Sequence, residues 1–195
     1  MRERKFAFSL PNMLTYGRVA AIGLIVAAYA LVTDFANNDT ARLTAAFVFL
    51  IASATDFFDG YYARKWDMGT ALGKMLDPIA DKMLVAVVLL ILCADGTISG
   101  WQILAPALIL CREFLVSGLR EIAGGAKGVT SVTQLAKWKT TTQLIALLLL
   151  LAGPVWAVWL TTTGMVLLWV SAGLTLFTGY DYLWKTLAYL TREAD

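Results

Sequence analysis

Six long apolar segments, separated by short polar ones, dominate the hydropathy pattern of this chain. They cover about residues 13–33, 41–63, 77–94, 101–122, 133–152 and 156–180. A helix of about 20 residues crosses the ~30 Å hydrocarbon layer of a bilayer. Because a chain in lipid must satisfy its backbone hydrogen bonds internally, such segments form helices or closed barrels, and these lengths suit helices. The pattern therefore predicts an all-α integral membrane protein with six transmembrane helices.

Composition agrees with this prediction. Hydrophobic residues make up 59% of the chain, against about 45–50% in a typical soluble domain. No polar block is long enough to fold alone, so we expect residues 1–195 to form a single membrane-embedded domain. The first apolar segment is too long for a signal-peptide core, and we expect it to be retained. Residues 1–9 carry three basic side chains and are expected to form a short interfacial helix on anionic headgroups.

The basic residues are distributed unequally between the two ends of the predicted helices. With six spans, both termini share one side with the second and fourth connections, and this side collects every Lys and Arg except Arg42. The positive-inside rule then predicts a multi-pass protein of the cytoplasmic (inner) membrane with both termini in the cytoplasm. The net charge is only +2. We expect membrane lipids, and no nucleic acid, as partners.

Four carboxylates lie at the cytoplasmic end of the second and third predicted spans, in the string DFFDGYYARKWDMGTALGKMLDPIAD at residues 56–81. The first two are three residues apart and the last two are four apart, so each pair shares a helix face. Gly69 and Gly73 make a turn between the pairs plausible. A charge within a membrane costs roughly 2.5–3.5 kcal/mol, and like charges repel. The acids, Asp56, Asp59, Asp77 and Asp81, are therefore expected to hold divalent cations inside the helix bundle.

Carboxylate oxygens without sulfur or imidazole favour Mg²⁺, Mn²⁺ or Ca²⁺. Four acids can hold two ions, an arrangement suited to displacement at phosphorus. The chain has no histidine, which excludes Ser-His-Asp triads and histidine-based zinc sites. Two other interpretations of the acids are an ion- or proton-conducting cluster and ion pairs with Lys74 and Lys82.

The acidic string resembles the signature of the CDP-alcohol phosphotransferase family, D-x-x-D-G-x-x-A-R followed after eight residues by G-x-x-x-D-x-x-x-D. All eight defined positions are present at the same spacing. The resemblance implies six helices around a membrane-facing cavity, a homodimer and two Mg²⁺ or Mn²⁺ ions. It implies that Asp56, Asp59 and Asp77 ligate the metals, and that Asp81 accepts the proton of the attacking alcohol and contacts the second metal. It implies that the CDP moiety is lined by Gly60, Ala63, Arg64 and Gly73.

A second cluster near the same membrane side is basic. Arg112 and Arg120 are eight residues apart, about two turns, and so share a helix face, while Lys137 and Lys139 begin the fifth span. Such a set suits a second anion, for example the phosphate of the acceptor alcohol. The positive-inside bias or lipid-headgroup anchoring would also explain basic residues here.

The wider sequence is similar to the branch of this family that forms phosphatidylglycerophosphate. The similarity lies in LPNMLTYGR, REFLVSGLRE and LAKWKTTTQ. It implies CDP-diacylglycerol as donor, glycerol 3-phosphate as acceptor and CMP as leaving product, with Thr15 and Arg18 beside the nucleotide. Polar residues after Pro11 are also ordinary helix-start chemistry. The alternatives are another acceptor (inositol phosphate, serine or a phospholipid) and, in a different class, a small cation transporter.

Overall fold

The structure is a computed structural model, which describes residues 10–32, 34, 38–66, 71–122 and 134–193. Side chains are described at 15–32, 34, 38–55, 76, 78–119, 138–188 and 191. The predicted interfacial helix at residues 1–9 lies outside the described part. The described residues form helices and no strands, which confirms the all-α prediction. The elements are α2 (Leu10–Ala30), α3 (Asp39–Trp66), α4 (Ala71–Ala94), η1 (Gly100–Ile103), α5 (Leu104–Ile122), α6 (Gln134–Trp156) and α7 (Val158–Glu193).

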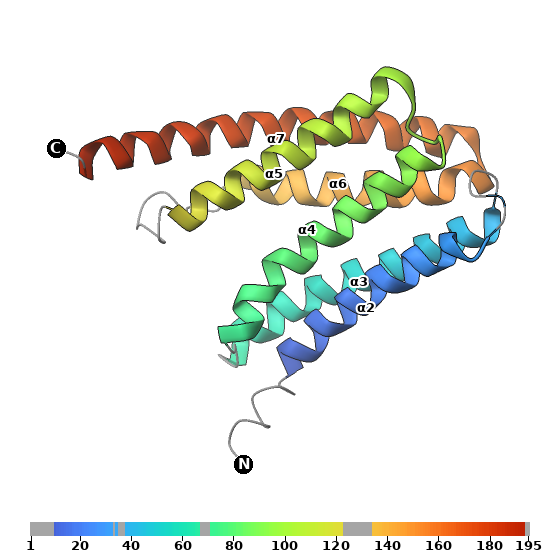
Figure 1. Cartoon of the computed structure of the whole chain (residues 1–195), viewed down its shortest axis with the longest axis horizontal. Coiled ribbons are helices and arrows are strands. Elements are labelled where there is room, and N and C mark those ends of the chain that lie inside the picture. Colours follow the sequence, from blue (N-terminus) through green and yellow to red (C-terminus); the bar gives the residue numbers. More distant parts are fainter. Residues whose placement is uncertain (1–9, 33, 35–37, 67–70, 123–133, 194–195) are drawn as a thin grey trace, which may run out of the picture.

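The helices alternate in direction along the chain (Figure 1). Helices α2, α4 and α6 finish, and α3, α5 and α7 begin, at one end of the bundle, which we call the far end. At the other end, which we call the near end, α3 and α5 finish and α4 and α6 begin. Helix α2 packs on α3 and α4, while α6 packs most extensively on α7, which also contacts α5. Contacts of α3 and α4 with α6 join the two groups.

Local chemistry explains where two of the helices begin and end. At the start of α3 the Asn38 side-chain oxygen accepts a hydrogen bond from the Ala41 amide at 2.8 Å, as expected of an N-cap residue. At the end of α4 the backbone of Gly96 has φ +78°, a left-handed conformation that suits glycine. The predicted stop of this segment at Asp95-Gly96 is therefore confirmed.

Three predicted boundaries were wrong. The second connection is shorter than predicted, because α3 continues to Trp66 and α4 already begins at Ala71, so Gly73 lies within a helix and not in a turn. Helix α6 passes the expected stop at Gly153-Pro154 and ends at Trp156, because the missing amide of Pro154 removes one helical hydrogen bond without ending the helix. Helix α7 continues beyond residue 180 to Glu193, because apolar residues still recur at helical spacing there, at Leu183, Leu187 and Leu190.

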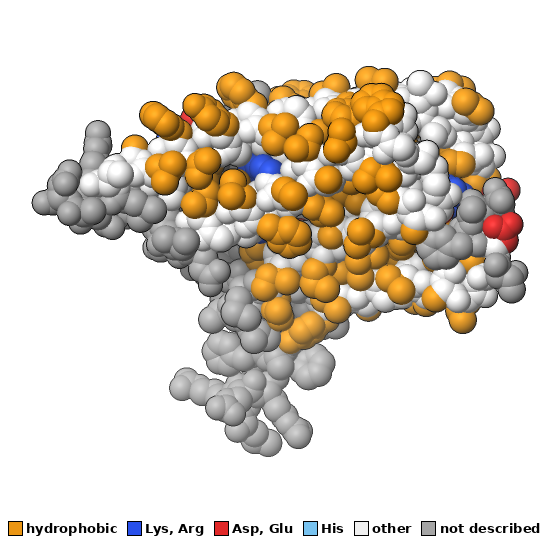
Figure 2. All heavy atoms as spheres, turned by 45° about the horizontal axis from the view of Figure 1, so that its top comes forward, with side chains coloured by type: hydrophobic (Ala, Val, Ile, Leu, Met, Phe, Trp, Pro, Cys, Tyr) orange, Lys and Arg blue, Asp and Glu red, His pale blue; other side chains and the backbone are white. Residues whose placement is uncertain are grey.

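The outer surface of the bundle is apolar. Figure 2 shows hydrophobic side chains spread over most of one face, and many large ones are exposed on several helices, including Phe114, Trp138 and Phe177. Exposed apolar area of this extent is typical of contact with lipid. Within the described residues three helical segments are long and apolar enough to cross a membrane: Gly100–Leu119, Trp138–Trp156 and Val158–Ala188. The chain is therefore a membrane-embedded helical protein.

Candidate active site

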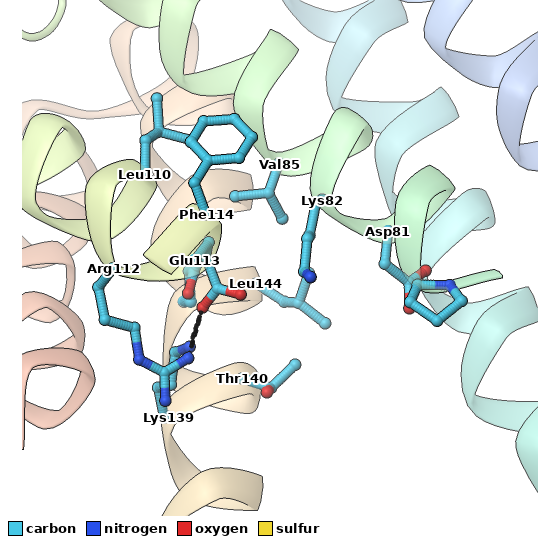
Figure 3. Close-up of a pocket in the computed structure, with 12 residues that line it drawn as sticks. Asp81, Lys82, Val85, Leu110, Arg112, Glu113, Phe114, Lys139, Thr140 and Leu144 are labelled. Carbon is cyan, nitrogen blue, oxygen red and sulfur yellow. Dashed lines mark hydrogen bonds and ion pairs between the residues drawn. The ribbon is translucent and has the colours of Figure 1, made fainter. Parts of the chain in front are cut away.

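A cavity of about 320 Å³ opens between α4, α5 and α6. Helix α4 contributes Asp81 and Lys82 to its lining, α5 contributes Arg112 and Glu113, and α6 contributes Lys139. Figure 3 shows Arg112, Glu113 and Lys139 gathered on one side of the cavity and Asp81 on the other, with Lys82 between them. Three charged residues predicted from sequence in two separate clusters thus line one space.

Glu113 connects the two predicted basic residues of this cavity. Its Oε1 atom accepts a hydrogen bond from Arg112 Nη1 at 3.0 Å and forms an ion pair with Lys139 Nζ. The three side chains are 14%, 18% and 7% exposed for Arg112, Glu113 and Lys139. Two cations therefore share one carboxylate in a largely buried place, which leaves one positive charge in excess and favours binding of a further anion.

Helix α2 holds the side chain of Asp81. Arg18 on α2 forms an ion pair with the Asp81 carboxylate on α4, with the arginine 3% and the aspartate 48% exposed. This contact brings a residue predicted to lie beside the nucleotide against the predicted catalytic acid. The other N-terminal candidate, Thr15, is also buried, three residues earlier on α2. Lys82 lines the same cavity, while the Lys74 side chain lies outside the described part, so the pairing of the acids with these two lysines stays a prediction.

The remaining motif acids are placed by the backbone alone. Asp56 and Asp59 lie in the last turns of α3, and Asp77 lies in α4 one turn before Asp81. Both pairs are in continuous helix, so each has the spacing that puts two side chains on one face. Five steps of at most ~3.6 Å join Trp66 to Ala71, so the two helix ends are within about 18 Å of each other.

Several predicted site residues have side chains outside the described part. They are Asp56, Asp59, Gly60, Ala63, Arg64, Gly73, Asp77, Arg120 and Lys137. Their helices nevertheless end or begin at the near end of the bundle, where the cavity opens. Among the described side chains alone, no group of three acids, cysteines or histidines gathers that could hold a metal.

Sequence reasoning did not assign four polar residues of the cavity lining to the site: Lys82, Glu113, Thr140 and Gln143. Gln143 lies four residues after Lys139 and Thr140 three after Lys137, so helical spacing from the two predicted lysines was the signal that could have found them. Glu113 was visible only as a neighbour of Arg112, because its contact with Lys139 depends on how α5 packs near α6.

A second hollow, of about 260 Å³, lies between α2 and α3. Its lining is mostly apolar and includes Leu24, Phe47 and Ile51, while Arg18 lies at the end of this lining nearest the N-terminus. Because Arg18 also contacts Asp81, an apolar groove and a charged site meet at one side chain.

Comparison with known proteins gives the family. The sequence model described as CDP-alcohol phosphatidyltransferase matches residues 8–177. The chain belongs to the CDP-alcohol phosphatidyltransferase family. A Rickettsia bellii protein named CDP-diacylglycerol–glycerol-3-phosphate 3-phosphatidyltransferase is 46% identical over 176 residues, which cover 89% of this chain and 93% of the relative. A Cereibacter sphaeroides protein of the same name is 36% identical over 225 residues, with 95% and 99% coverage.

A relative with a different name also matches. A rice protein named cardiolipin synthase (CMP-forming) is 38% identical over 196 residues, which cover 91% of this chain and 57% of the relative. The family resemblance found in the acidic string is thus confirmed along most of the chain, while the relatives carry two different enzyme names.

Proposed function

We infer that this protein transfers the phosphatidyl group of CDP-diacylglycerol to glycerol 3-phosphate, which forms phosphatidylglycerophosphate and releases CMP in phospholipid biosynthesis. The names of the bacterial relatives that match over nearly their full length support this reaction. The structural observation that carries it is the shared cavity: the predicted catalytic carboxylate of Asp81 and the basic side chains Arg112 and Lys139 line one space of about 320 Å³.

The acceptor binds on the basic side of this cavity. Arg112 and Lys139 already share the single negative charge of Glu113, so a phosphate group finds donors and a positive excess there. Arg120 and Lys137 belong to the same proposal, since their helices place them near this end of α5 and α6. A phosphate monoester carries close to two negative charges near neutral pH, which an acceptor such as serine does not offer.

The donor lipid approaches from the side of α2 and α3. The groove between these helices is apolar and exposes Leu24, Phe47 and Ile51, which suits one hydrocarbon chain of the lipid. Arg18 at its end marks the passage from the apolar chain to the polar headgroup. The CDP moiety is proposed to lie along Thr15, Gly60, Ala63, Arg64 and Gly73.

Divalent cations fit the acids at this end of the bundle. The set Asp56, Asp59, Asp77 and Asp81 offers only carboxylate oxygen, which is the donor type of Mg²⁺ and Mn²⁺ sites. Asp81, the one member with a described side chain, is 48% exposed at the cavity and therefore accessible to an ion. When bound, two such ions would neutralise negative charge on the pyrophosphate of the donor.

The chain's own groups supply the other parts of the reaction. Arg18 orients the Asp81 carboxylate, and Asp81 takes the proton of the acceptor hydroxyl as general base. The hydroxyl oxygen forms a bond to the lipid-bearing phosphorus, and the bond from that phosphorus to the CMP oxygen breaks. Arg112 and Lys139 hold the acceptor phosphate away from the reacting phosphorus. The step needs no covalent intermediate with the protein.

We propose further that all six long helices span the membrane, that both termini and the cavity face the cytoplasm, and that two chains form a homodimer. The alternation of helix direction along the chain supports the first point (Figure 1). Arg64 in the last turn of α3 and Arg120 in the last turn of α5 lie at the near end, among the residues that the positive-inside rule assigns to the cytoplasm. In this arrangement the site contacts soluble glycerol 3-phosphate and the lipid donor at the same time.

The experiment that tests the reaction is CMP release by the purified protein in detergent. The protein is given CDP-diacylglycerol and Mg²⁺, and then glycerol 3-phosphate, inositol phosphate, serine or phosphatidylglycerol in separate reactions. We expect CMP release that depends on glycerol 3-phosphate. The lipid product, identified by mass spectrometry, should be phosphatidylglycerophosphate.

The other outcomes separate the alternatives. CMP release with phosphatidylglycerol or another alcohol alone would keep the acid site but reassign the basic side of the cavity. A folded protein that binds no CDP-diacylglycerol and releases no CMP would overturn the transferase proposal and support a role in cation transport.

A further inference from the structure

We propose that Thr178 and Gly179 on α7 are positioning residues that hold the Arg112 guanidinium at the cavity for the phosphate of the acceptor. This inference rests on the proposed function, because it names residues that support the acceptor end of the same site. Neither residue lines the cavity itself. Both act through Arg112, which α5 presents to the cavity while α7 packs behind it.

Thr178 gives Arg112 a fixed hydrogen-bond partner. Arg112 Nη2 donates to Thr178 Oγ1 at 3.1 Å. The same hydroxyl lies 2.9 Å from the carbonyl oxygen of Leu174 and 3.1 Å from that of Thr175 on its own helix. Because the single hydroxyl proton is directed to the helix backbone, a lone pair of Oγ1 remains for the arginine. The threonine is therefore oriented as an acceptor by α7 itself.

Gly179 gives Arg112 its space. A methyl group at this position would lie 2.8 Å from Arg112 Cγ, 3.2 Å from Nε and 3.5 Å from Cδ. The first of these atoms is close to the arginine backbone, so a small rotation of the guanidinium would not relieve the overlap. The glycine thus allows the arginine stem to pass directly over α7, and any side chain here would push Arg112 away from its present course.

The arginine has a second space that it could enter. A groove of about 300 Å³ between α5 and α7 is lined by Arg112 and Gly179 together with apolar residues such as Leu108 and Leu115. Arg112 therefore separates this apolar groove from the charged cavity. Its Nη1 is bonded to Glu113 and its Nη2 to Thr178, while its buried Nε has no hydrogen-bond partner in the described part of the chain. Two contacts, one from each side, decide which space the guanidinium faces.

Paired variants test this role. Thr178→Val removes the acceptor oxygen at nearly constant shape, and Thr178→Ser restores it. Gly179→Ala adds the overlapping methyl group. The matched controls on the same helix are Thr163→Val, whose hydroxyl bonds only the carbonyl of Trp159 at 2.8 Å, and Gly173→Ala, where a methyl group meets nothing within 4 Å.

For each full-length variant, CMP release is measured at increasing glycerol 3-phosphate with saturating CDP-diacylglycerol. It is then measured at increasing CDP-diacylglycerol with saturating glycerol 3-phosphate. We expect Thr178→Val and Gly179→Ala to raise KM for glycerol 3-phosphate about tenfold, as for loss of a hydrogen bond to a charged group. KM for CDP-diacylglycerol should stay within twofold. Thr178→Ser and both controls should resemble the unchanged protein. In an Arg112→Ala background, Thr178→Val should have no further effect on KM, because the residue it positions is gone.

The inference is overturned if Thr178→Val leaves KM for glycerol 3-phosphate unchanged, or if it still raises that KM in the Arg112→Ala background. A lower kcat, with equal changes in both KM values and a lower melting temperature, would show a merely structural role and overturn the inference too. If Gly179→Ala does not fold, the Thr178→Val and Thr178→Ser pair decides alone. Failure of the unchanged protein to use glycerol 3-phosphate is a separate result, which contradicts the proposed function itself.

Discussion

The two ends of the bundle each contain a buried cluster of charged side chains, and the clusters differ in how their charges are balanced. At the far end, Arg42 Nη2 lies 3.0 Å from Asp95 Oδ2, with side chains 5% and 0% exposed. Tyr29 donates to the same carboxylate at 3.3 Å, and the Thr97 amide donates to its other oxygen at 2.9 Å. One cation pairs with one anion here, and neutral groups donate the other hydrogen bonds to the carboxylate.

At the near end two cations, Arg112 and Lys139, share Glu113, and the group lies on a cavity of about 320 Å³. The far-end residues do not line that cavity. A neutral, fully surrounded pair has nothing left with which to bind a ligand, whereas an excess charge beside open space does. Burial of charge alone is therefore a poor guide to function in this protein, and the balance of charge together with access distinguishes the site from the structural cluster.

The largest effect is expected from Asp81→Asn at the near end. Loss of the general base should lower CMP release by about 10²–10⁴-fold, while binding of CDP-diacylglycerol persists. The measurement is steady-state CMP release alongside a binding assay with the donor lipid. Arg18, only 3% exposed, would then face a neutral amide, so the melting temperature should also fall, but by less than for a pair that is buried on both sides. Turnover close to that of the unchanged protein would remove Asp81 from the role of base.

The same chemical change at the far end, Asp95→Asn, should act on stability and leave the reaction intact. Breaking a buried ion pair by removing one partner costs about 3–5 kcal/mol, since Arg42 would stay buried opposite a neutral group. Thermal unfolding in detergent should show a clear decrease in melting temperature. KM for glycerol 3-phosphate, measured well below that temperature, should be unchanged. A variant of normal stability with an altered KM would contradict the division between the two clusters.

A smaller effect is expected from Glu113→Gln, which changes the charge balance at the cavity. The amide still offers an oxygen to Arg112 and Lys139, but a charged partner contributes about 1 kcal/mol more than a neutral one. Phosphate would then compete with a weaker internal partner, so KM for glycerol 3-phosphate should fall about fivefold.

The matched control for that change is Asp181→Asn, which removes one partner of an exposed ion pair with Lys185 on α7. Its effect on KM should be close to zero, because exposed pairs contribute little. A higher KM in Glu113→Gln would show that the carboxylate mainly orients its two partners and does not compete with the ligand.

The sequence predicted the helices well, because long apolar segments are a strong signal, but it placed several ends wrongly. The apolar pattern predicts an end of helix α7 near residue 180, although Thr186 in its polar continuation is still fully buried. Gly153-Pro154 predicts a helix stop, yet the chain after it still forms the hydrogen bond from the Ala157 amide to the Gly153 carbonyl oxygen at 2.9 Å. Apolarity marks where lipid or core contact is strong, which is not the same as where backbone hydrogen bonding stops.

The candidate site was predictable where its residues form a motif or follow helical spacing. Asp81 belongs to the acidic string, and Arg112 and Lys139 to basic segments, so each was found from sequence. Their gathering in one cavity, and the contact of Arg18 with Asp81, depend on how α2, α4, α5 and α6 pack. Thr178 had no sequence signal at all, since a threonine in an apolar helix usually bonds only its own backbone.

The contact of α7 with Arg112 has a consequence for protein engineering. A redesign of acceptor preference that replaces only residues facing the cavity would leave the path of the Arg112 side chain fixed by Gly179, a residue outside that lining. Exchange of Arg112 for a bulkier or shorter side chain would leave either an overlap with α7 or an unfilled space beside the glycine. Libraries for altered acceptor use should therefore vary positions 178 and 179 together with the residues of α5 and α6, because residues of all three helices shape the acceptor end of the cavity.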